Sequence, residues 1–399
     1  MVATMPGGAC PRPRSRSAFS VSAAPARAAR WLDAGRPETP VLVIDTAIVA
    51  ERYRALARGL QGAAIHFAVK ASPEPAILAR LAGEGCRFDA ASRAEIALCL
   101  DAGARPDAIS FGNTVKRPGD IAWAHARGVR LFMADAAEEI DKIAAHAPGA
   151  RLCLRILLEE SPGDWPLSRK FGCAPESAPA LMDRARSLGL VPEGISFHIG
   201  SQTRSPEMWR PALAAVAQVW RALHAAGHRP GLLNIGGGFP AGYDGPAGPG
   251  LEDYARAVAR IVADTVGPVP QLMAEPGRAL AAEAGVIEAE VLLVDRKRES
   301  DLARWVYLDI GRFSGLAETE GEAIRYAIET TADGGAAGPC ILAGPSCDSV
   351  DVLYERRPVR LPLALAAGDR VRILSAGAYT ASYASVGFNG FPPLDVVCL

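Results

Sequence analysis

The sequence predicts an α/β protein: a (β/α)8 barrel of the TIM type, followed by an all-β domain that forms a sandwich or a small barrel. Two observations support this fold class. Between residue 40 and about residue 284, short apolar segments alternate eight times with segments of helical spacing. After residue 285, strand-like segments separated by short turns dominate. An open doubly wound sheet is the alternative for the first part, but eight regular units favour closure into a barrel.

The length of 399 residues allows two domains, one of them a barrel of about 250 residues. Residues 1–37 are rich in Ala, Arg, Ser and Pro; we expect a disordered extension there, with an organelle transit peptide as the alternative. We expect the barrel over residues 38–284 and the β domain over residues 285–399. The strand within residues 38–46 is a candidate for a further strand of the β domain.

Short segments rich in β-branched or aromatic residues are the predicted strands. The predicted barrel strands are Ile65–Val69, Cys86–Asp89, Ala108–Phe111, Arg130–Ala134, Leu152–Leu157, Ile195–Ile199, Leu232–Ile235 and Gln271–Glu275. The predicted strands of the β domain are Val286–Val294, Arg304–Asp309, Cys340–Ala343, Val359–Leu361 and Arg370–Leu374.

Composition excludes several function classes. The formal net charge of −1 argues against a nucleic acid or an anionic membrane as a partner, because both favour a basic excess. No apolar run reaches about 18 residues, so no membrane-spanning helix is predicted. The eight cysteines are scattered without a CxxC pair, which predicts neither a metal site nor a disulfide framework. This cysteine usage indicates the reducing cytoplasm.

The C-terminal ends of the predicted barrel strands carry functional groups or glycines, and in barrels of this kind the active site forms there. Lys70 ends the first of these strands, where burial is expected to depress its pKa and make it a nucleophile that can form an imine with an aldehyde. A lysine that snorkels to solvent is the alternative when this stretch is considered alone. The full set is Lys70, Asp89, Asn113, Asp135, Arg155, His198, the glycines 236–238 and Glu275.

Two of these strand ends predict a phosphate site. Gly236, Gly237 and Gly238 allow backbone N–H groups to surround an anion, although a flexible turn is the alternative. Arg278 follows Glu275 on a Pro-Gly turn and offers a planar fork for phosphate, with a surface ion pair as the alternative. A phosphate nest, an arginine, a glutamate and an imine-forming lysine together suggest pyridoxal 5′-phosphate, whose protonated ring is an electron sink.

Three further segments carry candidate groups. His198 and Ser201 end the sixth strand, where the imidazole could stack on a flat ring and the hydroxyl could bind phosphate. Cys347 and Asp348 lie in a turn of the β domain, where a thiol could donate a proton and a carboxylate could pair with an ammonium group. Tyr379 presents a phenol that could reach a phosphate. A satisfied core histidine and a capped turn are the alternatives for the first two segments.

Taken together, these residues resemble the fold-type III pyridoxal-phosphate-dependent decarboxylases of ornithine, lysine and diaminopimelate. The resemblance extends from about residue 40 to the C-terminus and is greatest to the bacterial ornithine decarboxylase group. The matching stretches are FAVKAS, FDAASRAEI, LSRKFG, SFHIGSQ, NIGGGFP, AEPGR, GPSCDS, GAYT and FNGF.

The resemblance implies a role for each matching residue. Lys70 would form the internal aldimine, Glu275 would hold the pyridine nitrogen, and His198 would stack on the ring. Cys347 would return a proton to the substrate carbon, and Asp348 would bind the side-chain amine. In the family these last two residues come from the partner subunit, which implies a head-to-tail homodimer. The phosphate would be held by Ser201, Gly238, Arg278 and Tyr379 on a loop shaped by Gly236 and Gly237, with Asp89 and Arg155 flanking the cofactor.

The substrate expected from this resemblance is ornithine, converted into putrescine and CO2. Family members that act on diaminopimelate have Glu after the cysteine, whereas Asp348 matches the type that binds a bare ammonium. Lysine, diaminopimelate or another diamino acid is the alternative. The chain lacks the FNCILYDH-like stretch that supplies a second substrate carboxylate in eukaryotic relatives, and Glu318 or Glu322 could replace it. Asn234 stands where the family often has Asp.

Two other classes are weaker alternatives. Racemases of the same barrel type resemble an arrangement with Arg at the pyridine nitrogen, whereas this chain has Glu275. A non-catalytic homologue would be expected to have lost Lys70 or Cys347, and both are present.

Overall fold

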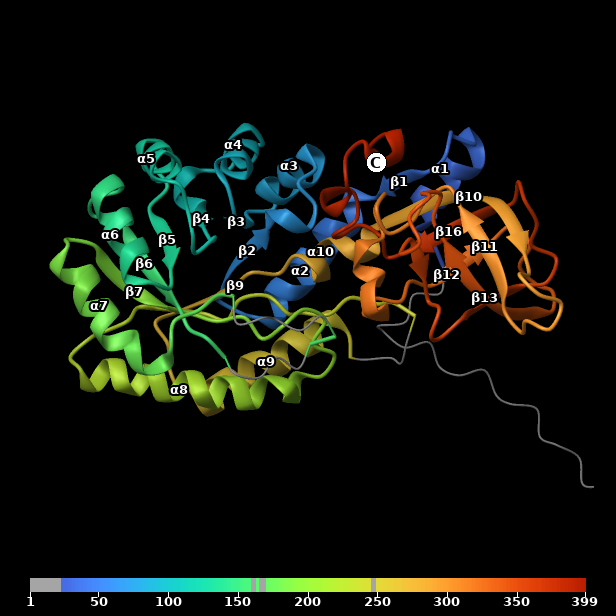
Figure 1. The fold of residues 1–399 in the computed structure, drawn as a ribbon. Coiled ribbons are helices and arrows are strands. Elements are labelled where there is room, and N and C mark those ends of the chain that lie inside the picture. Colours follow the sequence, from blue (N-terminus) through green and yellow to red (C-terminus); the bar gives the residue numbers. More distant parts are fainter. Residues whose placement is uncertain (1–22, 159–162, 165–169, 245–248) are drawn as a thin grey trace, which may run out of the picture.

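The computed structural model describes residues 23–158, 163–164, 170–244 and 249–399. Eight parallel strands close into a barrel in the order β2 to β9, and the remaining strands form a separate sheet. Figure 1 shows the barrel with its helices on one side of the molecule and the sheet, coloured orange and red, on the other. The predicted fold class, a closed (β/α)8 barrel followed by a β domain, is therefore confirmed.

Each barrel strand pairs in parallel with its neighbours in the chain, and β2 pairs with β9 to close the ring. Residues on both faces of these strands are buried, which explains why they read as continuous apolar runs. Leu131 and Met133, for example, pack in a small cluster with Cys153, whereas Phe132 belongs to the main core. The strands are β2 (Ala64–Ala68), β3 (Arg87–Ala90), β4 (Ile109–Phe111), β5 (Leu131–Ala134), β6 (Arg151–Arg155), β7 (Val191–Ser196), β8 (Leu232–Asn234) and β9 (Gln271–Ala274).

Helices surround the barrel, and α2, which precedes the first strand, packs against both α9 and α3. The start of α4 illustrates how the sequence fixes these connections. The Ser92 hydroxyl accepts from the N–H of Glu95, and the Glu95 carboxylate accepts from the N–H of Ala91, so the SRAE segment forms a variant of the capping box in which the glutamate binds the residue before the N-cap. The helices are α2 (Thr46–Gly59), α3 (Pro75–Gly83), α4 (Arg93–Asp101), α5 (Pro118–Ala126), α6 (Ala137–His146), α7 (Ala178–Ser187), α8 (Trp209–Ala225), α9 (Leu251–Thr265) and the short α10 (Arg278–Ala281).

The second sheet has nine strands and is mixed, because β11 and β13 pair in parallel while most other pairs are antiparallel. The long strand β10 pairs with β1, β11 and β16, so the strand before the barrel joins this sheet. The strands β12, β14 and β17 were not predicted; each is short or lies at the end of the chain. The strands are β1 (Val41–Ile44), β10 (Gly285–Asp295), β11 (Arg304–Leu308), β12 (Ile328–Thr330), β13 (Ala337–Ala343), β14 (Val352–Leu353), β15 (Val359–Pro362), β16 (Arg370–Leu374) and β17 (Asp395–Cys398).

The prediction of a disordered extension over residues 1–37 is wrong for its C-terminal part, because Ala26–Gly35 form the helix α1. Its side chains Ala28 and Leu32 are buried in a cluster with Val41, Val43, Val286 and Leu374, and Arg372 pairs with Asp33 of the helix. This apolar face covers the β1–β10 pair, so the segment is ordered by tertiary packing that its composition does not reveal. Residues 1–22 lie outside the described residues.

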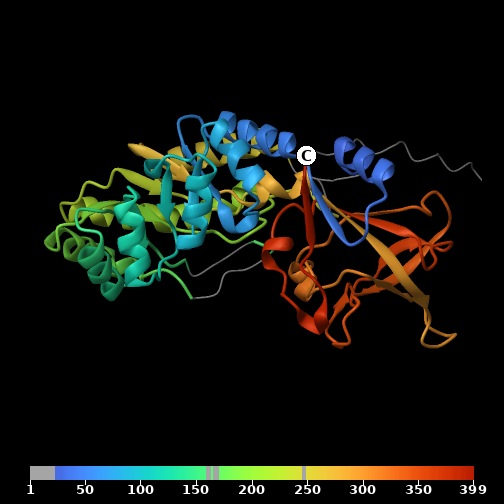
Figure 2. The ribbon, with the colours of Figure 1, turned by 90° about the horizontal axis from the view of Figure 1, so that it is seen from above.

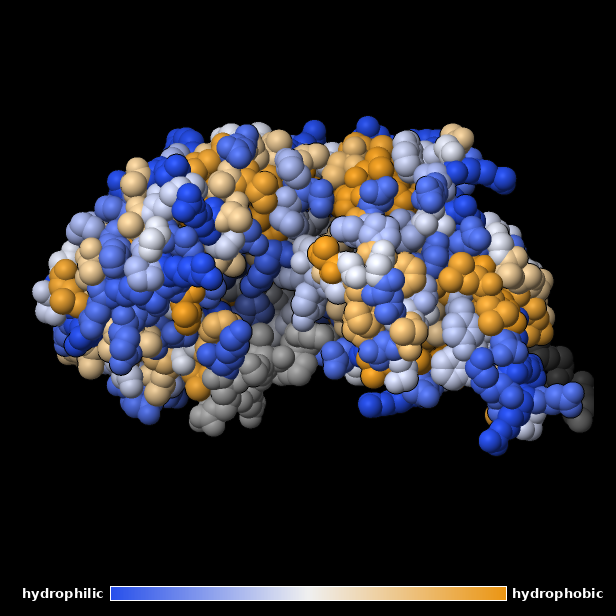
Figure 3. All heavy atoms as spheres, turned by 45° about the horizontal axis from the view of Figure 1, so that its top comes forward, coloured by the Kyte–Doolittle hydropathy of each residue, from blue (hydrophilic) through white to orange (hydrophobic). Residues whose placement is uncertain are grey.

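The barrel and the sheet domain lie side by side when the molecule is seen from above (Figure 2). The space-filling view shows one face that is hollowed where the two parts meet (Figure 3). Among the helices that the structure describes, none combines the length and the apolarity that crossing a membrane requires.

Candidate active site

A cavity of about 640 Å³ lies at the C-terminal ends of the barrel strands, where the sheet domain meets the barrel. Lys70 and Glu275 both open into it. Side chains from beyond residue 285 complete its wall, so the cavity depends on both parts of the chain. The lining residues predicted from the sequence are Lys70, His198, Ser201, Gly237, Gly238, Glu275, Arg278 and Tyr379.

Lys70 lies in a single 3-10 turn, Val69–Ala71, directly after β2. Its side chain projects into the cavity, where it is open to the hollow but surrounded by protein, while Val69 and Ala71 are buried. The expectation of a depressed pKa is wrong: the pKa of Lys70 is raised. Desolvation alone would lower it, but attraction to Tyr379, Asp89 and Glu275 outweighs that effect. Lys70 is therefore a cation before it meets an aldehyde, and it must lose a proton to act as a nucleophile.

Asp89 and Arg155 lie beside the cavity rather than in its lining. The Ser110 hydroxyl donates to Oδ1 of Asp89 at 3.1 Å, and His66 Nδ1 lies 3.2 Å from the same hydroxyl. Burial, followed by repulsion from Glu275, raises the pKa of Asp89 well above its usual value. Asp89 and Arg155 both contribute to the electrostatic environment of Lys70.

His198 follows β7 and is held in one tautomer. The backbone N–H of Gly200 donates to Nδ1 of His198 at 3.0 Å, so Nε2 carries the proton of the neutral ring. Burial, followed by repulsion from Arg155 and Lys70, lowers the pKa of His198 well below its usual value. The imidazole is therefore a neutral, flat group on the cavity wall.

The glycine loop after β8 leaves room that no other residue would leave. A Cβ on Gly237 would lie 2.9 Å from Nε2 of His198, and a Cβ on Gly238 would lie 2.5 Å from Cγ2 of Ile199. Gly236 and Gly238 also have positive φ angles of 67° and 107°. Gly236 shapes the loop without lining the cavity.

Arg278 is buried at the start of α10, and the two edges of its guanidinium bind different partners. Nη1 and Nη2 donate to the two carboxylate oxygens of Glu318 at 2.7 and 2.5 Å, while Nε donates to the Ser201 hydroxyl at 3.1 Å. The phenol oxygen of Tyr243 also accepts from Nη1. Attraction to Tyr243 and Glu318 overcomes desolvation and raises the pKa of Arg278. The Nε edge is thus next to Ser201, which also lines the cavity.

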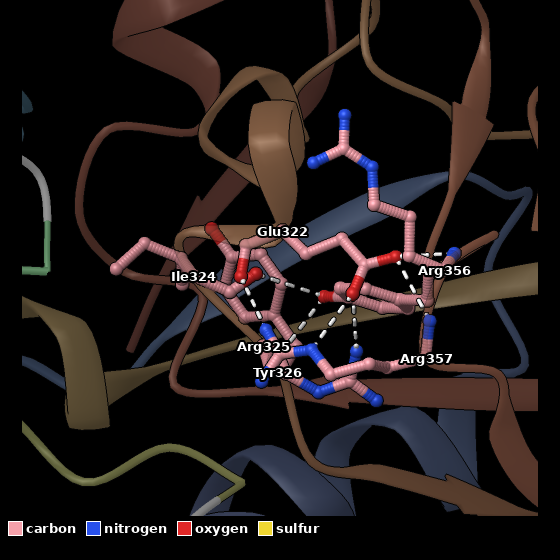
Figure 4. A network of polar contacts seen from close by, with 7 residues as sticks. Glu322, Ile324, Arg325, Tyr326, Arg356 and Arg357 are labelled. Atoms are coloured by element: carbon pink, nitrogen blue, oxygen red, sulfur yellow. Dashed lines mark hydrogen bonds and ion pairs between the residues drawn. The ribbon is translucent and has the colours of Figure 1, made fainter.

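The structure separates the two candidates for a second substrate carboxylate. Glu318 lines the cavity, but both of its oxygens accept from Arg278. Glu322 does not line it and accepts from the N–H groups of Arg356 and Arg357 and from the guanidinium of Arg357 (Figure 4). Although burial alone would raise it, these bonds hold the pKa of Glu322 below its usual value. Glu322 is therefore committed to the structure of the sheet domain.

Tyr379 reaches the barrel from the segment after β16. Its N–H donates to the carbonyl of Ala71 at 2.8 Å, and its ring lies 4.9 Å from the guanidinium carbon of Arg278. A Cβ on Gly277 would lie 3.0 Å from the phenol oxygen. Desolvation raises the pKa of Tyr379, so the phenol keeps its proton and remains a hydrogen-bond donor.

Cys347 and Asp348 do not line the cavity of their own chain. Both are exposed in the loop after β13, where the N–H of Cys347 donates to the side chain of Asn389 at 3.0 Å. The sequence predicts a role for these residues from their chemistry and from the resemblance, and the structure places them outside the cavity that holds Lys70. Within the described residues, the site of one chain therefore lacks the predicted proton donor.

Some residues of the cavity were missed. Ser382 and Tyr383 line the cavity but gave no sequence signal, and Lys170 and Phe171 line it from the LSRKFG stretch, to which no role was assigned. Tyr243 does not line the cavity, but its phenol oxygen accepts from Arg278. Asn113 and Asp135 do not line the cavity; Asp135 accepts from the N–H of Gly172 instead. Residues 167–169 of the LSRKFG stretch lie outside the described residues.

The G112A variant tests how tightly Asp89 is held. A Cβ on Gly112 would lie 1.9 Å from Oδ1 of Asp89, so the carboxylate must move away from Ser110. We expect the free energy of unfolding to fall by about 1–3 kcal/mol, as in overpacked cores, in a denaturant titration. The control is G119A in α5, where nothing lies within 4 Å of the new methyl group and stability should not fall. Unchanged stability of G112A would contradict the packing described for Asp89.

The donor set fits a phosphorylated aromatic aldehyde. Lys70 can bind the aldehyde, Glu275 can accept from a ring N–H, and Ser201, Gly238, Arg278 and Tyr379 offer donors to a phosphate. The glycine loop provides a hollow that any Cβ would fill. These are the features that pyridoxal 5′-phosphate requires, and they surround one cavity.

Comparison with known proteins supports this cofactor. Residues 46–282 match the family model for the pyridoxal binding domain of pyridoxal-dependent decarboxylases. The chain is 33% identical over 361 residues to the lysine/ornithine decarboxylase of Selenomonas ruminantium, covering 90% of this chain and 89% of that protein. It is 32% identical to the ornithine decarboxylase of Schizosaccharomyces pombe (84% of this chain, 77% of that protein) and 32% identical to the diaminopimelate decarboxylase of Zymomonas mobilis (89% and 86%).

Solved structures of similar proteins also support this family and this cofactor. The structure of SrLDC with PLP and cadaverine matches with a TM-score of 0.83 and 29% identity, covering 95% of both chains. The arginine decarboxylase of Paramecium bursaria Chlorella virus with agmatine matches with a TM-score of 0.83 and 28% identity, covering 93% of this chain and 99% of that one. The chain therefore belongs to the fold-type III pyridoxal-phosphate-dependent decarboxylases and is a lyase that uses pyridoxal 5′-phosphate to decarboxylate a basic amino acid.

Proposed function

We propose that the protein decarboxylates L-ornithine to putrescine and CO2, with L-lysine as the second substrate. The observation that carries this choice is the pair Cys347-Asp348, in which a single short carboxylate follows the cysteine. One carboxylate suits a bare ammonium group, whereas a second amino-acid end would also need a cation for its carboxylate. Relatives that act on ornithine, lysine and diaminopimelate are about equally similar to the chain, so similarity alone does not choose among them.

The contacts of the cavity residues support a role for each. Lys70 would bind the aldehyde of the cofactor, and Glu275 would accept from its ring nitrogen. The neutral His198 ring would lie against the ring face, and Asp89 and Arg155 would flank it. Ser201, Gly238, Arg278 and Tyr379 would hold the phosphate on the loop shaped by Gly236 and Gly237.

Bound pyridoxal phosphate supplies an electron sink for the pair released when the carboxylate leaves. The protein supplies binding, orientation and the returning proton. Asp348 binds the distal ammonium of the substrate by a charge-assisted hydrogen bond, which sets the length of the substrate. The Cys347 thiol donates a proton to the substrate carbon after CO2 has left.

We also propose that the active site is completed by a second copy of the chain. Cys347 and Asp348 lie on an exposed loop that contacts the segment at residues 385–392. That surface exposes large apolar side chains, which is unusual for a face that stays in water. They are Val350, Val386, Phe388 and Phe391. A homodimer would cover them and bring Cys347 of one copy to Lys70 of the other.

The free cysteines of the described residues also fit a cytoplasmic location.

A substrate panel tests the proposed function. We expect kcat/KM, measured by CO2 release, to be highest for ornithine, lower for lysine, and at least about 100-fold lower for arginine and diaminopimelate. Arginine has a bulkier guanidinium in place of the ammonium that pairs with Asp348, and diaminopimelate adds a second charged group. The D348N variant should reduce kcat/KM for ornithine by about 10- to 100-fold through loss of the charged hydrogen bond. Higher activity on diaminopimelate than on ornithine would reject the substrate but not the cofactor.

A further inference from the structure

The side chains of Asn234 and Glu275 meet at the C-terminal edge of two adjacent strands. Asn234 ends β8 and pairs with Met273 of β9, two residues before Glu275. The Asn234 amide nitrogen lies 2.5 Å from Oε1 of Glu275, and Asn234 is completely buried. The carboxylate that faces the cofactor therefore has a fixed neighbour behind it.

The orientation of the Asn234 amide is determined by a third group. The backbone N–H of Gly236 donates to Oδ1 of Asn234 at 2.9 Å. A backbone N–H can only donate, so the amide oxygen must face Gly236 and the NH2 group must face Glu275. Glu275 consequently accepts a hydrogen bond from Asn234. The Asn234 side chain also accepts from Gly236, the first glycine of the glycine loop after β8.

We propose that Asn234 is a positioning residue that keeps Glu275 as a hydrogen-bond acceptor toward the cofactor's ring nitrogen, without adding a titrating group to the site. This inference rests on the proposed role of Glu275. An Asp at position 234 would accept from Gly236 with one oxygen and place the other against Glu275. Two carboxylates at that separation hold a shared proton, and the site would then gain a pH dependence that this chain avoids.

The surroundings of Glu275 support this reading. Charged and titratable groups reach it from every neighbouring element, and Asp89 already has a raised pKa because of burial and of repulsion from Glu275. A further carboxylate in this cluster would take up a proton rather than remain charged. The amide of Asn234 carries no charge, so it adds no group that must take up a proton. The groups that interact with Glu275 are Lys70 after β2, Asp89 on β3, Cys153 and Arg155 on β6, and Asn234 on β8, with His198 after β7 close by.

Binding of pyridoxine 5′-phosphate tests the inference without catalysis. This probe has the ring nitrogen and the phosphate but no aldehyde, so Lys70 cannot capture it. The Kd is measured by fluorescence between about pH 6 and pH 9 for the full-length protein and for N234D. We expect N234D to lose affinity on the alkaline side more steeply than wild type, by up to about tenfold more per pH unit, because its complex needs one additional proton.

Three further variants separate the possible outcomes. Q271E makes the same amide-to-carboxylate change at the other end of β9 and should keep the wild-type pH profile. N234A should bind the probe about tenfold more weakly at every pH, with the wild-type slope, because the donor to Glu275 is lost. A wild-type profile for N234D, or a wild-type Kd for N234A, overturns the role of Asn234. Wild-type binding by E275Q would instead overturn the proposed role of Glu275.

Discussion

Replacing Lys70 with alanine is expected to remove both cofactor capture and decarboxylation. Lys70 directly follows the barrel strand β2 and lines the cavity together with Glu275, whereas Lys170, the other lysine among the described lining residues, comes from the loop after β6. Without it the aldehyde has no covalent partner, and we expect kcat to fall at least about a thousandfold. The measurement pairs the near-ultraviolet and visible absorbance of protein mixed with pyridoxal phosphate with the rate of CO2 release.

Two companion variants make this expectation sharp. K70R keeps the positive charge beside Asp89 and Glu275 but cannot bind the aldehyde, so it should fold normally and be as inactive as K70A. K297A removes an exposed lysine that pairs with Asp295 on the sheet domain and should leave the spectrum and the rate unchanged. Retention of the absorbance change in K70A would assign cofactor capture to another amine and reject the proposed site.

The raised pKa of Lys70 shows what a linear sequence hides. The apolar strand before Lys70 predicts desolvation correctly, and desolvation is the largest single influence on its pKa. The opposing influences come from Tyr379 in the segment after β16, from Asp89 on β3 and from Glu275 after β9. Their joint effect depends on closure of the barrel and on the position of the sheet domain beside it, so its direction could not be obtained from the stretch around Lys70 alone.

The barrel itself was predictable because its strands are buried on both faces and its helices are amphipathic, so periodicity records the architecture directly. The helix α1 was not predictable, because only Ala28 and Leu32 are buried and their partners lie on β1, β10 and β16. The position of the Glu318 side chain was not predictable either, because it depends on contacts with residues far away in the sequence. Its 3-10 turn, Ala317–Glu322, has no periodicity, and only the fold shows that its carboxylate faces Arg278 while that of Glu322 faces away.

The second prediction is that two inactive variants, K70A and C347A, restore activity to each other in mixed dimers. K70A and C347A should each be inactive or nearly so alone, because one lacks the group that binds the cofactor and the other lacks the proton donor. Cys347 is exposed and outside the cavity of its own chain, so in the proposed homodimer each site would take Lys70 from one copy and Cys347 from the other. Mixing the two variants under conditions that allow subunits to exchange should therefore restore activity.

The size of that recovery follows from the symmetry of the dimer. Random exchange makes half of the dimers mixed, and in each mixed dimer one of the two sites has both residues intact, so recovery should approach about a quarter of the wild-type rate. Mixing K70A with E275Q is the matched control, because both substitutions fall on the same side of the interface and their mixed dimers contain no intact site. If K70A and C347A recover no activity although mixed dimers form, Cys347 does not complete the partner's site, and the proton donor must be sought among the residues that line the cavity around Lys70.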